Sequence, residues 1–128
     1  MFDSKFDIKT NKTVNQLNNG DKNIQIVVIL IKHLENCRLK NGSNISKFLA
    51  GDETGSVECC FFEEVAENIR DGDVLYLTGA YCSLHKNHIV LYQARQGYGI
   101  VYKVNEFFFP FALKPNISEK EVTDTNNQ

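Results

Sequence analysis

Apolar and polar residues alternate along residues 81–92 in the pattern of a β-hairpin. If the turn closes on Lys86 and Asn87, successive residues of each strand point to opposite faces. One face is apolar and suits a core: Cys82, Leu84, Ile89 and Leu91. The other face carries three cross-strand pairs: Tyr81 with Tyr92, Ser83 with Val90, and His85 with His88. Aromatic rings that a sheet holds toward solvent are typical of surfaces that stack exposed nucleobases.

The same kind of pattern predicts the rest of a small β-domain. The hairpin strands extend over residues 74–84 and 88–94, and further strands are predicted at residues 24–31, 45–50 and 56–62. The first of these is rich in β-branched residues and apolar on both faces, so we expect it to be buried from two sides. Residues 56–62 divide into one face with Val57, Cys59 and Phe61 and another with Glu58, Cys60 and Phe62. Residues 63–69 predict a short helix, whose acidic first turn suits the helix dipole.

Five strands with a helix after the third indicate a particular fold. This order is that of the OB-fold, a partly open barrel that binds oligonucleotides and oligosaccharides. We therefore predict an all-β protein, a five-stranded OB-fold barrel with a short helix between strands 3 and 4. Gly79 lies inside the fourth strand, where glycine permits the sharp coiling that closes a small barrel.

The ends of the chain differ in composition from this domain. Residues 1–23 are polar and rich in asparagine, and we expect a flexible N-terminal arm. The OB-fold domain is predicted over residues 24–113, because residues 101–113 are too apolar for a free tail. Packing along the barrel is favoured for most of this stretch over an apolar interaction surface. Residues 114–128 have the composition of a disordered C-terminal tail.

Charge narrows where an anionic ligand can bind. The net charge of −2 argues against a protein that holds phosphate by bulk attraction, and residues 52–73 carry eight acidic residues against Arg70 alone. In OB-folds the ligand lies across the second and third strands, between the loop joining strands 1 and 2 and the loop joining strands 4 and 5. We predict phosphate contacts from the cations expected around that path: Arg38, Lys40, Lys86 and Arg95.

Other chemistry has less support in the sequence. The four cysteines have no CxxC spacing, so buried free thiols are favoured over a metal site or a disulfide. His85 and His88 face each other, yet that face offers no clear third ligand, so zinc is the weaker interpretation and we expect neither metal nor cofactor. The chain has no nucleophile elbow or phosphate-binding glycine loop, which argues against an enzyme. With no apolar run long enough to span a membrane and a start too polar for a signal peptide, we expect a soluble intracellular protein.

An ordered set of motifs resembles one family. The motifs are Ala50-Gly-Asp-Glu-Thr-Gly-Ser-Val57, Phe62-Glu-Glu-Val-Ala-Glu-Asn-Ile69, Asp71-Gly-Asp-Val-Leu-Tyr-Leu-Thr-Gly-Ala-Tyr81 and Leu91-Tyr92. They resemble the single OB-fold single-stranded DNA-binding proteins that form the B subunit of the SOSS complex, in register over residues 13–118. This resemblance implies base-stacking residues at Phe62, Tyr81, His85 and Tyr92, although the family usually has tryptophan and phenylalanine at the Phe62 and His85 positions.

The resemblance also implies a biological setting. It points to a nuclear protein of the DNA damage response that docks on a large scaffold subunit through a segment resembling Glu106-Phe107. The predicted function is sequence-tolerant binding of single-stranded DNA by base stacking. Two alternatives stay open: an RNA-binding OB-fold, because stacking hardly distinguishes the sugars, and a protein-interaction module of a nuclear complex with weak nucleic acid binding.

Overall fold

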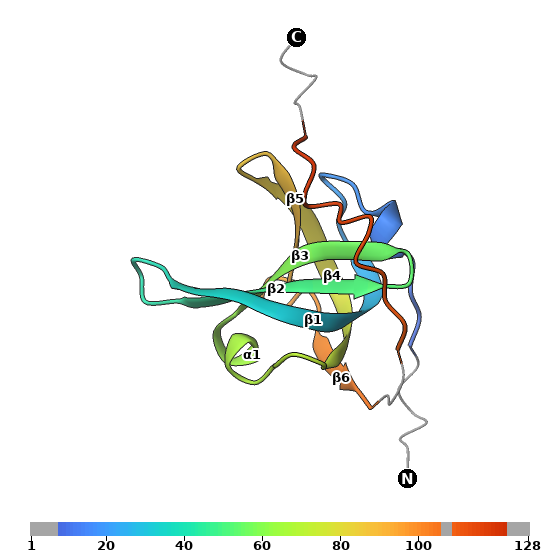
Figure 1. Ribbon diagram of the computed structural model, residues 1–128. Coiled ribbons are helices and arrows are strands. Elements are labelled where there is room, and N and C mark those ends of the chain that lie inside the picture. Colours follow the sequence, from blue (N-terminus) through green and yellow to red (C-terminus); the bar gives the residue numbers. More distant parts are fainter. Residues whose placement is uncertain (1–7, 106–108, 123–128) are drawn as a thin grey trace.

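The computed structural model describes residues 8–105 and 109–122, which form six strands with two short helical turns (Figure 1). The strands are β1 (Ile24–Arg38), β2 (Asn44–Asp52), β3 (Gly55–Phe62), β4 (Val74–His85), β5 (His88–Tyr92) and β6 (Val101–Val104). A 3-10 helix, η1 (Val14–Gln16), precedes β1, and the helix α1 (Glu63–Glu67) connects β3 to β4. Among the described residues, no helix is long and apolar enough to cross a membrane.

The strands close into a barrel. Their order in the sheet is β1-β2-β3-β5-β4-β6, and an additional pairing of β1 with β4 joins the two sides. The β3–β5 pairing is parallel, and the other pairings between named strands are antiparallel. The predicted fold class, with five barrel strands and a helix between the third and fourth, is confirmed. The strand β6, which was expected only as a packed segment, adds to the edge of β4.

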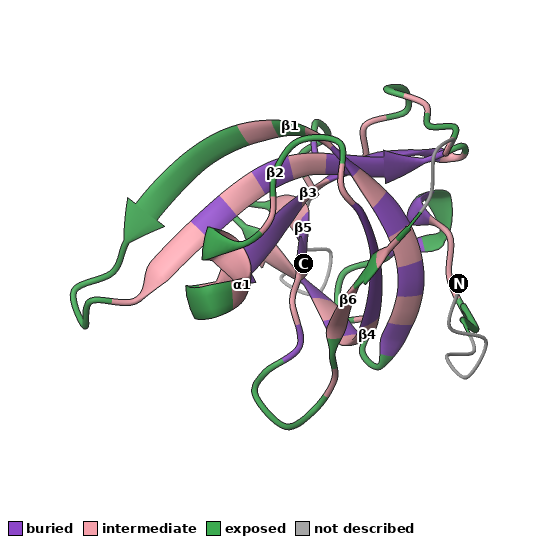
Figure 2. Cartoon of the chain, turned by 90° about the horizontal axis from the view of Figure 1, so that it is seen from below, coloured by how far each residue is buried: buried purple, intermediate pink, exposed green. Residues whose placement is uncertain are grey.

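The first strand is buried on one face only, contrary to the two-sided burial expected. Ile24, Ile26, Val28 and Leu30 are fully buried, while the residues between them are partly exposed. Burial therefore alternates along the strand, as the alternating purple and pink segments of the barrel strands show in Figure 2. β1 also continues seven residues beyond Ile31 to Arg38. That outer part pairs with β2 in an exposed hairpin that projects from the barrel.

β4 changes partners just after Gly79, between Ala80 and Tyr81. Residues from Val74 to Ala80 pair with β1, and residues from Tyr81 onward pair with β5. Gly79 has a φ of +67°, a conformation that side chains disfavour. A Cβ atom there would also overlap the carbonyl oxygen of Tyr98. The predicted need for glycine is confirmed, and a close backbone approach adds a second reason for it.

Residues 8–23, the described part of the predicted arm, are held to the barrel through Val14 and Leu17 instead of forming a loose arm. Val14 is fully buried and Leu17 is 4% exposed, and both belong to the main hydrophobic core. The backbone N–H of Val14 donates to Oδ2 of Asp52, whose other carboxylate oxygen accepts bonds from the N–H and hydroxyl of Thr54. These bonds anchor η1 to the β2–β3 turn.

Residues 114–122 likewise differ from the expected disordered tail. Ser118 is buried; its hydroxyl accepts a hydrogen bond from the Glu58 N–H (2.8 Å) and donates one to the Ile89 carbonyl (2.6 Å). Isolated bridges pair Ser56 with Asn116 and His88 with Glu121. The segment therefore lies between the first residues of β3 and β5, where these strands do not pair with each other.

The cysteines are free thiols. Cys59, Cys60 and Cys82 are buried, as expected, whereas Cys37 is exposed in the projecting β1–β2 hairpin. Burial raises the pKa of the Cys60 thiol to about 11 and that of Cys82 to about 12. These two thiols therefore stay protonated and act as small apolar groups.

Candidate nucleic-acid interface

The β4–β5 hairpin has the predicted register. Tyr81 pairs with Tyr92, Ser83 with Val90, and His85 with His88. Lys86 and Asn87 form the turn with φ values of +53° and +72°, as a two-residue turn of type I′ requires. The tyrosines are consequently neighbours on the outer face of the sheet, while Cys82 and Leu91 lie in the core.

Three aromatic rings from three strands stack into what we call the aromatic column: Phe62 of β3, Tyr92 of β5 and Tyr81 of β4. The ring centroids of Phe62 and Tyr92 are 6.4 Å apart at an interplanar angle of 12°, and those of Tyr92 and Tyr81 are 5.3 Å apart at 17°. All three residues are partly exposed. The parallel pairing of Cys60 with Tyr92 sets the β3 and β5 members side by side, and the Phe62 N–H donates to the Gln93 side chain at 2.8 Å.

The rings of the column contact each other directly, which limits where a base can stack. Both centroid distances are those of paired aromatic side chains. A base inserted between two rings would have to separate them by about 3.4 Å, the spacing of stacked base pairs. Bases would therefore stack at the Phe62 and Tyr81 ends of the column or lie against its exposed edges.

The tyrosine in the middle of the column remains uncharged. Burial, together with the neighbouring Cys60, Tyr81 and Glu58, raises the pKa of Tyr92 to about 12. The phenol is therefore neutral at physiological pH, and its ring does not repel a phosphate backbone.

Only one of the four predicted phosphate-binding cations lies against the column. The guanidinium carbon of Arg95 is 5.5 Å from the centroid of the Tyr81 ring. Arg38 ends β1 and donates to the carbonyl of Gly42, and Lys40 lies in the following exposed loop. Lys86 is exposed at the tip of the β4–β5 hairpin. In Figure 1 both hairpins project from the barrel.

His85 is not a member of the column. It lies four residues beyond Tyr81 along β4, and its side chain is exposed. Its cross-strand partner His88 contacts the carbonyl of Ser118 through Nδ1 at 2.6 Å. Within the described residues, no group of three or more potential ligands could hold a metal ion. The predicted partner-binding residues Glu106 and Phe107 lie outside the described residues.

The surface over β2 and β3 is less basic than a phosphate path requires. Lys47 of β2 forms ion pairs with Glu58 at 3.2 Å and with Glu35 at 3.6 Å. Although burial disfavours its charged form, these carboxylates raise the pKa of the Lys47 ammonium. The cation is thus already neutralised, and one more carboxylate than ammonium group is present. The sequence pattern placed Glu58 on the Phe62 face but did not single out Lys47.

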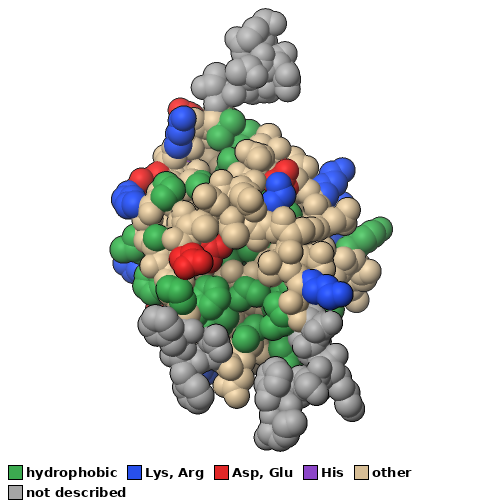
Figure 3. Space-filling view, turned by 90° about the vertical axis from the view of Figure 1, so that its right-hand side faces the viewer, with side chains coloured by type: hydrophobic (Ala, Val, Ile, Leu, Met, Phe, Trp, Pro, Cys, Tyr) green, Lys and Arg blue, Asp and Glu red, His purple; other side chains and the backbone are tan. Residues whose placement is uncertain are grey.

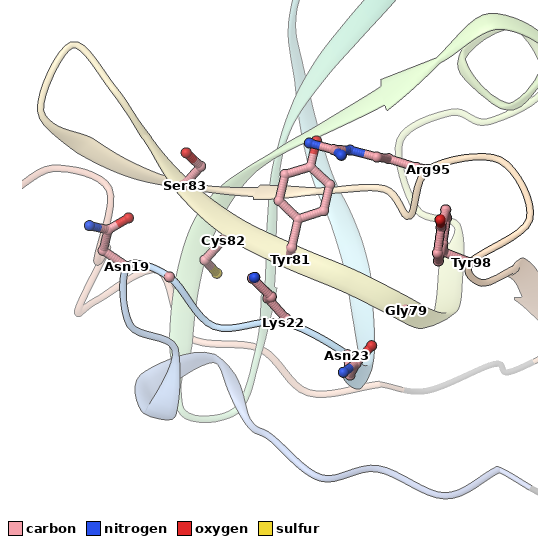
Figure 4. A pocket seen from close by; sticks show the side chains of 10 residues that line it. Asn19, Lys22, Asn23, Gly79, Tyr81, Cys82, Ser83, Arg95 and Tyr98 are labelled. Carbon is pink, nitrogen blue, oxygen red and sulfur yellow. The ribbon is translucent and has the colours of Figure 1, made fainter.

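A cavity beside Tyr81 was not predicted. It has a volume of about 510 Å³ and lies between the segment before β1, the middle of β4 and the loop after β5. Its lining residues are Asn19, Gly20, Lys22, Asn23, Gly79, Tyr81, Cys82, Ser83, Arg95 and Tyr98 (Figure 4). Prediction missed this cavity because residues 19–23 were expected to be loose.

The face opposite the projecting β1–β2 hairpin carries charges of both signs. Figure 3 shows that basic and acidic side chains are scattered over this visible face, with hydrophobic side chains gathered toward its lower part. The aromatic column and the adjoining cavity are therefore the strongest candidates for a ligand site among the described residues.

Comparison with known proteins shows the fold of the chain, but not the family that its sequence motifs resemble. No protein-family model matches the chain. Among solved structures, the second OB-fold domain of replication protein A from Methanococcus maripaludis matches with a TM-score of 0.57 and 13% identity, over 76% of this chain and 97% of that one. The chain has an OB-fold.

Two further solved structures match the chain. Pot1pC from Schizosaccharomyces pombe, bound to single-stranded DNA of sequence CGGTTACGGT, matches with a TM-score of 0.56 and 11% identity, over 76% of this chain and 88% of that one. A hypothetical protein from Arabidopsis thaliana matches with a TM-score of 0.73 and 18% identity, over 97% of this chain and 95% of that one. The OB-fold assignment rests on the replication protein A domain and Pot1pC.

Proposed function

We propose that this protein binds single-stranded DNA with little sequence preference, by stacking bases on the aromatic column. The observation that carries the proposal is the column itself, three partly exposed rings held nearly parallel across β3, β5 and β4, with the Arg95 guanidinium over the Tyr81 ring. Every nucleobase has an aromatic face, so a stacking surface accepts any sequence.

Preorganisation favours this use of the column. The rings already contact one another, so little side-chain freedom remains to be lost when a base binds. Each stacked base contributes about 1–3 kcal/mol in such sites. The fold supports the same ligand class, because Pot1pC has this fold and is bound to single-stranded DNA in its structure.

A finer assignment rests on the motif resemblance. We propose a role like that of the SOSS B subunit: a non-enzymatic nuclear protein of DNA repair that joins a large scaffold subunit. The ordered motifs around residues 50–81 and the two tyrosines of the column support it. Copurification of the full chain with a large scaffold protein, together with recruitment to damaged DNA, would test this setting.

A second candidate is a protein-interaction module. It is favoured by Phe111 and Leu113, whose exposed fractions are 45% and 53%, and by the acidic residues that neutralise Lys47. In that case nucleic acid binding would be weak and partner binding would not depend on the aromatic column.

Fluorescence anisotropy of a labelled oligothymidine tests the proposed function. We expect saturable binding that weakens with salt, and a loss of about 30-fold or more in the Tyr81→Ala, Tyr92→Ala double variant, since two rings contribute at least ~2 kcal/mol. Phe111→Ala is the matched control, because it removes an exposed ring elsewhere on the surface. Absence of binding by the folded wild-type protein would refute the proposal, and a titration with oligouridine measures the preference for DNA over RNA.

A further inference from the structure

The cavity beside Tyr81 is preformed by backbone contacts on both sides of β4. On one side, the Cys82 N–H donates to the Asp21 carbonyl at 2.9 Å, and the Gly20 N–H donates to the Cys82 carbonyl at 3.2 Å. On the other, the Thr78 N–H donates to the Ile100 carbonyl, and the Ile100 N–H donates to the Thr78 hydroxyl, both at 3.0 Å. The two walls are therefore fixed to the same strand that carries Tyr81.

Two residues of the cavity also take part in the aromatic column: Tyr81 is a member of the column, and Arg95 is the cation that lies against it. Figure 4 shows the Tyr81 ring standing up from β4, with the Arg95 side chain reaching across to it. Lys22 extends from the segment below toward β4, between Cys82 and Tyr81. The ring of Tyr98 borders the opposite side of the cavity and is 76% exposed. Single-stranded DNA that continues beyond the Tyr81 end of the column would enter this cavity directly.

The charge of the cavity suits a phosphodiester backbone. Its ten lining residues, all within the described part of the chain, include the cations Lys22 and Arg95 and no carboxylate. The nearby carboxylate of Asp21 is paired with Lys12 at 3.2 Å and accepts a bond from the Asn18 N–H. Among the described residues, no acid forms an ion pair with Lys22. Lys47 differs from Lys22, because Glu35 and Glu58 already neutralise its charge.

The remaining lining groups suit a nucleotide. A volume of about 510 Å³ lies within the range of small-ligand sites. The exposed Tyr98 ring offers a stacking face, and the amides of Asn19 and Asn23 can donate to and accept from base edges.

We infer that this cavity is a nucleotide subsite that continues the single-stranded path beyond Tyr81. Lys22 and Arg95 contact the phosphate of the entering nucleotide, and its base stacks on Tyr98. The inference rests on the proposed function and extends it. In this arrangement the single-stranded DNA runs past β4 toward the segment before β1, and away from the surface over β2 where Lys47 is neutralised.

Two variants and one control test the subsite in the full chain by anisotropy with oligothymidine. Lys22→Gln should lower the dependence of log affinity on log salt by about 0.7, the contribution of one phosphate contact in single strands. Tyr98→Ala should weaken binding at least about fivefold, the lower end of what one stacked base supplies. Lys9→Gln is the control, because this exposed side chain lies outside the cavity and the residue bonds to Tyr76 through its backbone.

A fluorescence measurement reports on the site directly. The chain contains no tryptophan, so Tyr98→Trp places its one tryptophan in the cavity wall, where it can be excited selectively over the tyrosines. Its emission should be quenched on addition of oligothymidine, with the same midpoint as the anisotropy titration. Both substitutions at Tyr98 change an exposed side chain, so the fold should be retained.

The outcomes separate the subsite from the column. If wild type binds and the Tyr81→Ala, Tyr92→Ala variant does not, while the Lys22 and Tyr98 variants match the Lys9 control and no quenching occurs, the subsite is refuted and the proposed function stands. If wild type binds no oligothymidine, both are refuted. Weakened binding in both cavity variants together with quenching supports the subsite.

Discussion

Replacing Gly79 by alanine should destabilise the protein more than the same change at another glycine with positive φ. Gly79 has a φ of +67°, and a Cβ atom there would overlap the Tyr98 carbonyl oxygen and lie 2.8 Å from its carbonyl carbon. Gly97, in the same connecting loop as Tyr98, has a φ of +88° and open space around a Cβ atom. The pair of variants therefore separates conformational strain from backbone collision.

The two costs can be compared with known magnitudes. A left-handed conformation costs a residue other than glycine about 1–2 kcal/mol, which applies to both variants. Forcing an extra carbon into a packed site costs about 1–3 kcal/mol more, and this cost applies to Gly79→Ala alone. We expect the free energy of unfolding to fall by about 2–5 kcal/mol in Gly79→Ala and by about 1–2 kcal/mol in Gly97→Ala.

Urea denaturation followed by circular dichroism measures both values. Failure of Gly79→Ala to fold, when Gly97→Ala folds, would agree with the larger cost. If the two variants lose the same free energy of unfolding to within about 0.5 kcal/mol, the level at which independent mutations agree, the close approach of Tyr98 to β4 is refuted.

Three further changes have defined outcomes. Glu58→Gln removes the closer of the two carboxylates that pair with Lys47, so oligothymidine binding should tighten, whereas Glu53→Gln at the β2–β3 turn should leave it unchanged. His85→Phe should tighten binding of a twelve-nucleotide strand but not of a trinucleotide. Position 85 lies about 13 Å along β4 from the column, so only the longer strand reaches both. Equal effects on both lengths would contradict this. Ser118→Ala should lower the free energy of unfolding by about 1–3 kcal/mol in thermal or urea denaturation, because it leaves the Glu58 N–H without its partner; an unchanged value would show that the C-terminal segment does not hold β3 to β5.

The hairpin was predictable because its signals are local. Strict alternation and a two-residue turn at Lys86 and Asn87 determine which residues face each other, and a one-residue slip would have moved Cys82 and Leu91 out of the core. The fold class followed from the order of such segments. The pairing of Tyr81 with Tyr92 needed no information from the rest of the chain.

The terminal segments were not predictable by the same reasoning. Residues before β1 have few apolar positions, and their packing depends on Val14 and Leu17 in a short helical turn anchored to Asp52. Ser118 is buried because its hydroxyl bonds to two strands that lie far away in sequence. A polar composition predicts that a segment is exposed. This prediction is wrong where hydrogen bonds satisfy the polar groups in the folded state.

The cavity and the charge of the outer face depend on register between distant strands. Lys47 meets Glu35 on one side and Glu58 on the other only because β1, β2 and β3 are aligned as they are. The cavity joins three segments, two of which are held against β4 by backbone hydrogen bonds at Thr78 and Cys82. Counting charges along the chain suggested basic loops at Arg38 and Lys86, while the structure places Lys22 and Arg95 at the cavity beside Tyr81.

Photocrosslinking with an oligonucleotide of 5-bromodeoxyuridine, followed by mass spectrometry of the peptides, tests base stacking on the aromatic column most directly. Irradiation joins the bromouracil to aromatic rings that it contacts. We predict crosslinks at Phe62, Tyr81 or Tyr92 that excess unlabelled oligothymidine competes away. Competable crosslinks confined to peptides that lack all three residues would contradict the account.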